Sequence, residues 1–441
     1  MSRGSLADLL AVWLPAQRWF AGSGAILRDL VISSDVRLKA GDPELAHLIV
    51  DATTGTQTVR YQVFVGLTAE LKPDLGPAAI GTLADGWTAY DAAVDPQLTA
   101  VLLDGIASQR TEGPISFRLE PGAVIDQAAA GRTLPATASN TSVVFGDKAI
   151  LKLLRRPSPG QHPDLELPSR LARSQSRLVA APRGWIELSA DDDEPTVLAI
   201  LAEYFAHSRD GWSLAIADLE SAEPDFSGPA GRLGQATAQL HAELAAAFGA
   251  GVLPPAALAD LAGIMAAELS LALGVVPDLA EHEQAIRACY TGLAELTSPV
   301  EIQRIHGDYH LAQVLDTAEG WVILDFEGEP SVPLTRRRAY APTLRDVAGM
   351  LRSFDYAAQH QLLHDPFDQR LRALAADWVR RCRDAFCAGY REVAGTDPRR
   401  NAPLLRALLL QKAVYEAVYE AKHRPGWLPI PLHAIAEAVD E

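Results

Sequence analysis

The sequence has few cysteines. Three occur among 441 residues, Cys289, Cys382 and Cys387, and they lack the paired spacing of metal-binding motifs. A disulfide framework is therefore not expected. Three small buried side chains in a reducing compartment, such as the cytoplasm, fit this cysteine usage best.

Long apolar runs are also missing. Charged residues or prolines interrupt the alanine-rich segments every few positions, so we expect no membrane-spanning stretch of roughly 20 apolar residues. Residues 1–17 contain no apolar run followed by a small-residue cleavage site, so we expect no export signal. Both absences predict a soluble protein.

Positive charge is scarce. The 39 lysine and arginine residues are outnumbered by 56 aspartate and glutamate residues, which gives a net charge of −17. Nucleic acid and anionic membranes are bound by basic surfaces, so this balance disfavours both as partners. A local basic pocket for one nucleotide remains compatible with it. The sequence leaves a monomer and a homodimer equally open.

The chain is long enough for two or three domains, since 48% of its 441 residues are hydrophobic and can fill several cores. Residues 1–90 are predicted to form a small α/β module, with a helix at Leu6–Leu14 and strands at Leu48–Asp51 and Val59–Gly66. A segment rich in proline and glycine, residues 73–86, marks the first boundary.

The middle of the chain, residues 91–203, is predicted to contain a small sheet. The apolar runs Thr141–Phe145 and Ala149–Leu154 are separated by Gly-Asp-Lys, which favours a tight hairpin because glycine and aspartate tolerate positive φ. A helix is expected from about Pro163, with acidic residues in its first turn. The run Val197–Leu201 is predicted to close the sheet.

The last part of the chain, residues 204–441, is predicted to be mainly helical. Segments rich in alanine and leucine have helical periodicity at Gly231–Phe248, Ala256–Leu273 and Asp368–Tyr390. Two short strands, Glu301–Ile305 and Gly320–Asp325, interrupt this pattern in a region rich in histidine, aspartate and glutamate. The sequence contains no internal repeat or low-complexity tract.

The strongest chemical signal is the segment His-Gly-Asp-Tyr-His-Leu-Ala-Gln at 306–313, followed by Leu-Asp-Phe-Glu at 324–327. Phosphoryl transfer from a nucleotide requires a proton acceptor for the attacking hydroxyl and oxygen ligands for magnesium. Asp308 follows a strand and a glycine turn, so we interpret it as the base. Gln313 would supply an amide oxygen to one metal ion, and Asp325 a carboxylate oxygen to the same ion or a second one.

This segment resembles the loop His-Gly-Asp-x-His-x-x-Asn of the aminoglycoside-phosphotransferase-like branch of the protein-kinase fold. Gln313 stands at the asparagine position, which keeps the amide and lengthens its reach. The resemblance implies an α/β (α+β), bilobal protein-kinase-like fold with a mostly helical C-terminal lobe, and ATP and Mg²⁺ as cofactors. His306 is interpreted as a packing residue, and Asp346 as a helix N-cap that braces the catalytic loop.

The same resemblance implies a phosphate-covering hairpin followed by a lysine. Four residues with hydroxyl or amide side chains occupy the hairpin position: Ser139, Asn140, Thr141 and Ser142. Lys152 lies in an apolar strand, where it needs a partner, and Glu166 in the next helix is the predicted one. An edge-strand lysine that reaches water is the alternative. Three residues would form the hinge that meets adenine: Glu203, Tyr204 and Phe205.

Further motifs resemble actinobacterial maltokinases and their close relatives across nearly the whole chain. They lie at residues 13–20, 306–315, 325–330, 345–353, 412–416 and 424–431. This resemblance implies an N-terminal α/β cap domain in front of the bilobal kinase.

The acceptor is expected to bind at the last part of the helical region. Gln411, Tyr415 and Tyr419 recur every four residues, and so do Lys412, Glu416 and Glu420. Polar and aromatic groups suit a sugar, although a helix packed by tyrosines fits the spacing equally well. With the resemblance, five residues are predicted to bind the sugar: His310, Gln411, Tyr415, Glu416 and Glu420.

The identity of the sugar follows from one position. Gln411 stands where maltokinases tend to carry aspartate, and the chain also resembles the maltokinase-like group that phosphorylates glucosamine. We therefore expect conversion of glucosamine to glucosamine 6-phosphate, with maltose to maltose 1-phosphate as the alternative. A regulatory pseudokinase that binds ATP without catalysis is the non-enzymatic alternative.

Overall fold

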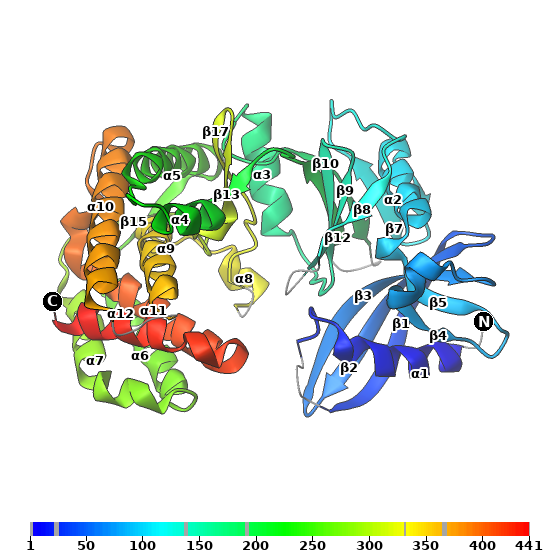
Figure 1. Cartoon of the computed structure of the whole chain (residues 1–441), viewed down its shortest axis with the longest axis horizontal. Coiled ribbons are helices and arrows are strands. Elements are labelled where there is room, and N and C mark those ends of the chain that lie inside the picture. The colour runs from blue at the N-terminus through cyan, green and yellow to red at the C-terminus, as the bar shows by residue number, and fades with distance from the viewer. Residues whose placement is uncertain are drawn as a thin grey trace. The chain divides into compact units, whose positions relative to one another are not determined.

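The computed structural model describes residues 3–21, 26–135, 140–189, 194–329, 332–363 and 368–440. The chain divides into two compact units (Figure 1). The N-terminal unit contains Met1–Ser169 and Ala180–Ala206, and the C-terminal unit contains Arg170–Val179 and His207–Glu441. The predicted combination of mixed sheet and helix in the first half and mainly helix in the second is confirmed.

The first sheet of the N-terminal unit has five antiparallel strands. Their order is β1 (Leu27–Lys39), β2 (Glu44–Thr54), β3 (Gln57–Thr68), β5 (Thr88–Asp91) and β4 (Ala79–Thr82). Helix α1 (Arg3–Trp13) contacts β1 and β4 and places Leu6 and Leu10 in a core with Trp19. The two predicted strands lie inside β2 and β3, and the predicted helix lies mostly inside α1.

The second sheet of this unit has seven strands. Their order is β6 (Thr111–Glu112), β7 (Ile115–Leu119), β11 (Pro182–Leu188), β12 (Thr196–Glu203), β10 (Ala149–Leu154), β9 (Asn140–Phe145) and β8 (Gly131–Thr133). Helix α2 (Pro96–Ser108) packs on this sheet, and α3 (Pro163–Arg173) follows β10. The predicted hairpin is the β9–β10 pair, which turns at Gly146 with a φ of +56°.

The two sheets of the N-terminal unit share a core. Phe64 of the first sheet belongs to the same apolar cluster as Leu151 and Leu198 of the second. The buried Gln62 side chain on β3 donates hydrogen bonds to the carbonyl oxygens of Leu154 (2.6 Å) and Leu198 (2.5 Å). Residues on either side of the predicted boundary at residue 90 therefore pack as one body.

The C-terminal unit is built mainly from helices. Its helices are α4 (Gly211–Leu219), α5 (Ser227–Phe248), α6 (Pro255–Leu273), α7 (Glu283–Gly292), α8 (Leu334–Arg337), α9 (Leu344–Leu362), α10 (Gln369–Ala394), α11 (Ala402–His423) and α12 (Pro429–Asp440). The three predicted helices correspond to α5, α6 and α10. Asp368 caps α10 by accepting from the N–H groups of Arg370 and Leu371.

Two small antiparallel sheets interrupt these helices. One contains β13 (Arg209–Asp210), β16 (Val314–Thr317) and β17 (Gly320–Ile323), and the other contains β14 (Ala250–Leu253) and β15 (Val300–Gln303). Strands β15 and β17 are the two that the sequence predicts, each two residues shorter at its C-terminal end. The segment between β15 and β16 carries the His-Gly-Asp motif.

Helix α6 (Pro255–Leu273) is long and rich in apolar residues. Its mean hydropathy is 1.7, and within the described residues it is the one helix whose length and composition would allow it to cross a membrane. Asp260 and Glu268, the helix's only charged residues, divide its apolar residues into shorter runs. In this structure α6 packs against α7 and α11, and buries Leu258 and Met265.

Candidate active site

A buried aspartate, Asp346, holds the backbone of the His-Gly-Asp loop. Asp346, in the first turn of α9, accepts hydrogen bonds from the backbone N–H groups of His306 (2.8 Å) and Gly307 (2.9 Å). Gly307 has a φ of +88°, which glycine adopts without strain. The predicted bracing role of Asp346 is confirmed, but the helix N-cap is Thr343 rather than Asp346.

Two histidines complete this support. The His306 ring is buried, accepts from the Asp308 N–H at Nδ1, and donates from Nε2 to the Leu324 carbonyl at 2.7 Å. His306 therefore joins the catalytic loop to the segment after β17, as its predicted packing role requires. His241 on α5 lies 3.2 Å from Asp346. Burial would raise the pKa of Asp346, but the hydrogen bond and charge of His241 hold it below its usual value.

Asp308 forms an ion pair with a lysine of α11. Lys412 Nζ lies 2.8 Å from Asp308 Oδ1 and 3.0 Å from Glu329 Oε1. Burial alone would raise the pKa of Asp308, but the charge of Lys412, with a smaller contribution from His310, holds it below its usual value. Asp308 is therefore a carboxylate at neutral pH, the form that can accept a proton from a hydroxyl group.

The two predicted magnesium ligands lie next to each other in the C-terminal unit. Gln313 ends the 3₁₀ turn Leu311–Gln313 and donates to Asp325 Oδ2 at 3.0 Å. Asp325 has a φ of +63°, a backbone region that non-glycine residues adopt rarely and mainly at functional sites. A role for Gln313 as a metal ligand requires its amide oxygen, since the nitrogen faces Asp325 here.

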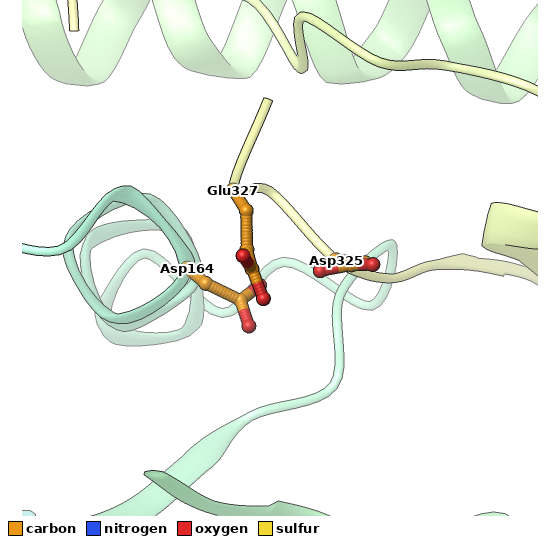
Figure 2. A group of neighbouring side chains, drawn as sticks. All are labelled: Asp164, Asp325 and Glu327. Atoms are coloured by element: carbon orange, nitrogen blue, oxygen red, sulfur yellow. The ribbon is translucent and has the colours of Figure 1, made fainter. Parts of the chain in front are cut away.

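Figure 2 shows a further carboxylate on the same segment. Glu327 follows Asp325 by two residues after β17, while Asp164, also labelled in the figure, belongs to α3 of the N-terminal unit. Carboxylate and amide oxygens are the ligands that Mg²⁺ prefers, so the donor set of this segment suits that ion. Glu327 was not among the predicted ligands, although its place in the Leu-Asp-Phe-Glu motif was a usable signal.

The predicted nucleotide residues lie on the second sheet of the N-terminal unit. Lys152 on β10 forms an ion pair with Asp164 at 2.8 Å, and the predicted pair with Glu166, two residues further along the same helix, stays a prediction. Asn140, Thr141 and Ser142 belong to β9, and Ser139 lies outside the described residues.

The predicted hinge lies at the end of β12, the strand that pairs with β10 on the side away from β9. Glu203 ends β12, and its N–H donates to the Ala181 carbonyl at 3.0 Å. The Tyr204 N–H donates to the Lys148 carbonyl, also at 3.0 Å, and Phe205 comes next in the chain. These two hydrogen bonds join backbone groups and hold the chain at the end of the sheet. The identity of the side chains therefore says little about whether this segment is a hinge.

A pocket of about 430 Å³ lies beside Asp308 in the C-terminal unit. Four of the five predicted sugar residues line it: His310, Tyr415, Glu416 and Glu420. Gln411 is not a lining residue, since its side chain amide donates to Glu268 of α6 at 2.7 Å. Sequence reasoning did not assign the remaining large or charged lining residues to the sugar: Trp212, Tyr356, Lys412, Tyr419, Arg424 and Trp427.

The two pocket glutamates are each held by an arginine. Arg352 Nη2 donates to Glu416 Oε2 at 2.8 Å, and Arg424 donates to both carboxylate oxygens of Glu420. The hydroxyl of Tyr356 donates to Glu420 at 2.6 Å. Burial raises the pKa of Glu416, and the charges of Arg352 and Lys412 oppose that rise.

Aromatic rings form the other part of the pocket. The rings of Trp212 and Trp427 lie 6.4 Å apart at an angle of 24°, and the Arg424 guanidinium lies 4.2 Å from the centre of the Trp427 ring. Oriented carboxylates beside flat aromatic faces can bind the hydroxyl groups and the C–H face of a sugar ring. The pocket therefore has the chemistry of a small polar ligand site next to a proton acceptor.

Comparisons with a family model and with known proteins match sugar kinases. Residues 13–95 match the maltokinase N-terminal cap domain. A glucosamine kinase of Mycolicibacterium smegmatis is 30% identical over 324 residues, 70% of this chain and 80% of the relative. A glucosamine kinase of Streptacidiphilus jiangxiensis is 28% identical over 343 residues, 73% of this chain and 74% of the relative.

Solved structures match over the whole chain. A glucosamine kinase in complex with glucosamine, ADP and inorganic phosphate has a TM-score of 0.68 at 23% identity and covers 98% of both chains. A second glucosamine kinase structure has a TM-score of 0.70 at 22% identity and covers 99% of both chains. At this identity the match shows the fold, which agrees with the predicted kinase-like architecture.

The cap, the kinase-like fold and the His-Gly-Asp loop together define a phosphotransferase with a sugar hydroxyl as acceptor. The cap domain is named after maltokinases, a related family. It therefore does not by itself distinguish the two expected activities, phosphorylation of glucosamine and phosphorylation of maltose. By its identity and coverage with the mycobacterial relative, the chain belongs to the glucosamine kinase family.

Proposed function

We propose that this protein transfers the terminal phosphoryl group of ATP to D-glucosamine, with Mg²⁺, and so forms ADP and D-glucosamine 6-phosphate. The observation that carries the proposal is the pocket beside Asp308, in which Glu416 and Glu420 present oriented carboxylates. The names of two curated relatives support the same acceptor. The three free cysteines fit a cytoplasmic location.

Asp308 has the central role in the proposed reaction. Its carboxylate would accept the proton of the sugar hydroxyl while the hydroxyl oxygen attacks the γ-phosphorus. The bond from that phosphorus to the β,γ-bridging oxygen breaks, and ADP leaves. Magnesium, when bound, neutralises phosphate charge, and Gln313, Asp325 and Glu327 are the residues that would hold it.

The pocket carboxylates would select the amino sugar. Glucosamine carries a protonated amino group, and a charge-assisted hydrogen bond to a carboxylate is roughly twice as strong as a neutral one. Arg352 and Arg424 already orient Glu416 and Glu420, so little side chain entropy is lost on binding. Gln411 has no part in this proposal, because Glu268 holds its amide outside the pocket lining.

The decisive assay compares acceptors with the purified full-length protein. ADP formation is measured with ATP, Mg²⁺ and, side by side, glucosamine, N-acetylglucosamine, glucose, maltose and an aminoglycoside. We expect the highest kcat/KM with glucosamine, at least about tenfold above N-acetylglucosamine, because acetylation removes the charge. Mass spectrometry and NMR then identify the phosphorylated position. Preferred turnover of maltose would contradict the proposal.

Asp308→Asn tests the base in the same assay. The amide keeps the shape of the side chain and cannot accept the proton, so we expect kcat to fall by at least about 10²-fold. ATP binding, followed by calorimetry, should be retained. A variant with kcat close to that of the wild type would refute the assignment of Asp308.

A further inference from the structure

Lys412 is a mostly buried cation that the catalytic scheme above does not use. Its side chain is 15% exposed, and its Nζ lies within hydrogen-bond distance of Asp308 Oδ1 (2.8 Å) and Glu329 Oε1 (3.0 Å). The same nitrogen lies 4.8 Å from the centre of the Tyr415 ring. A buried ammonium group is costly unless it is paired, and here two carboxylates and an aromatic face surround it.

Glu329 holds Lys412 in place from the other side. This glutamate is 8% exposed and also accepts from Arg345 at 3.4 Å. Burial would lower the pKa of Lys412, but the charges of Asp308 and Glu329 raise it above its usual value. Lys412 therefore remains an ammonium group across the pH range in which a kinase works.

The two oxygens of the Asp308 carboxylate have different surroundings. Oδ1 accepts from Lys412, and within the described part of the chain Oδ2 has no hydrogen-bond partner. Lys412, Asp308 and His310 all line the 430 Å³ pocket. A hydroxyl group of a sugar in that pocket would consequently find Oδ2 available and Oδ1 already engaged.

We propose that Lys412 is a positioning residue for phosphoryl transfer: its ammonium group fixes Asp308 Oδ1 and leaves Oδ2 to take the proton of the sugar hydroxyl. The inference rests on the proposed function. The proton moves from the sugar oxygen to Asp308 Oδ2 as that oxygen bonds to the γ-phosphorus, and Lys412 keeps all of its protons throughout. Glu329 acts through Lys412.

Several charged or titratable groups from different segments surround this pair. They are His306 and His310 on the catalytic loop, Glu329 after β17, and Lys412, Tyr415 and Glu416 on α11. Burial lowers the pKa of His310, so its ring is mainly neutral near pH 7. Lys412 is therefore the main positive charge that keeps Asp308 ionised, and its removal should raise the pKa of Asp308.

The test measures kcat and kcat/KM between pH 5 and pH 9 for Lys412→Met, Lys412→Arg and the wild type. Asp308 acts as a base only when ionised, so a higher pKa moves the acid limb of the profile to higher pH. For Lys412→Met we expect the acid limb to move up by about one pH unit or more. At pH values on the acid side of the limb, the rate should then be about tenfold lower than that of the wild type. Lys412→Arg should restore most of the profile. Lys422→Met is the matched control on an exposed position of the same helix, and its profile should equal that of the wild type.

A second variant guards against a folding defect. Glu329→Gln removes a negative charge near the pair and leaves Lys412 on Asp308, so the acid limb should move the opposite way or stay in place while kcat falls. Circular dichroism and thermal unfolding check that each variant is folded. An acid limb unchanged in both Lys412→Met and Glu329→Gln, with kcat within about threefold of the wild type, would overturn the inference. If the wild type prefers another sugar, the proposed function fails while the same pH series with that sugar still decides the role of Lys412.

Discussion

At the scale of single residues, the pocket depends on carboxylates that are oriented before any ligand arrives. Glu420 is almost fully buried, and three donors on Tyr356 and Arg424 hold its two oxygens. A carboxylate held in this way has fewer orientations to lose when it binds a cation. Its charge, rather than its shape alone, should therefore decide between an amino sugar and a neutral sugar.

Glu420→Gln should discriminate between the two kinds of sugar. We expect KM for glucosamine to rise about tenfold or more, because a hydrogen bond to a charged group contributes about 1.5–3 kcal/mol, and KM for glucose to change less. Steady-state kinetics with both sugars measures the ratio. Glu437→Gln on α12, away from the pocket lining, is the control. Equal losses with both sugars would mean that Glu420 serves only to hold Arg424.

The residues of this site differ in how far the sequence could reveal them. The stripe Lys412, Glu416 and Glu420 was visible from its spacing, and all three residues line the pocket. In the parallel stripe Tyr415 and Tyr419 also line the pocket, but Gln411 meets Glu268 of α6, a partner 143 residues away. Periodicity tells which residues share a helix face and not which helix that face will meet.

At the scale of elements, the C-terminal unit depends on a close contact between α5 and α10, which lie side by side in Figure 1. A Cβ atom added to Gly389 would overlap the backbone carbonyl oxygen of Gly231, and one added to Gly234 would overlap that of Phe386. Backbone has little freedom to move aside, so only glycine permits this approach. The contact also supports the site, because His241 of α5 reaches both Tyr390 of α10 and Asp346.

Gly389→Ala should destabilise this unit. Overpacking a well-packed contact costs about 1–3 kcal/mol, so thermal unfolding should begin several degrees lower and kcat should fall as Asp346 loses its support. Gly263→Ala on α6 is the matched control, since nothing lies within 4 Å of the added methyl group and alanine favours the helix. A Gly389→Ala protein that melts with or above the wild type would show that the helices can separate without cost.

Elements with strong local signals were predicted well. The β9–β10 hairpin followed from Gly-Asp-Lys, and α10 from its periodicity. Strand β1 (Leu27–Lys39) was not predicted, because its exposed and buried positions alternate irregularly and its pairing with β2 contains three register shifts.

At the scale of the whole molecule, the matched cap domain is joined to the predicted phosphate hairpin by one arginine of the N-terminal unit. Arg155 directly follows β10 and is 1% exposed. Its Nη2 donates to Asp91 of the cap at 2.5 Å, and its Nε donates to Thr141 of β9 at 2.9 Å. The guanidinium also lies 4.9 Å from the centre of the Trp19 ring. The N-terminal family motif was recognisable in the sequence, but nothing local indicated that Trp19 would contact a residue 136 positions later.

Arg155→Met tests whether the cap supports nucleotide binding. The variant leaves Asp91 buried without its charged partner, and breaking a buried ion pair costs about 3–5 kcal/mol, so the unfolding temperature should fall. Thr141 loses the same donor, so KM for ATP should rise as well. Arg60→Met is the control, since its pair with Asp51 is half exposed and such pairs contribute about 1 kcal/mol or less. A variant that melts early but keeps the wild-type KM for ATP would limit Arg155 to holding the cap in place. An unchanged melting temperature and KM would mean that the shared apolar core and the hydrogen bonds of Gln62 hold the cap and the hairpin together without Arg155.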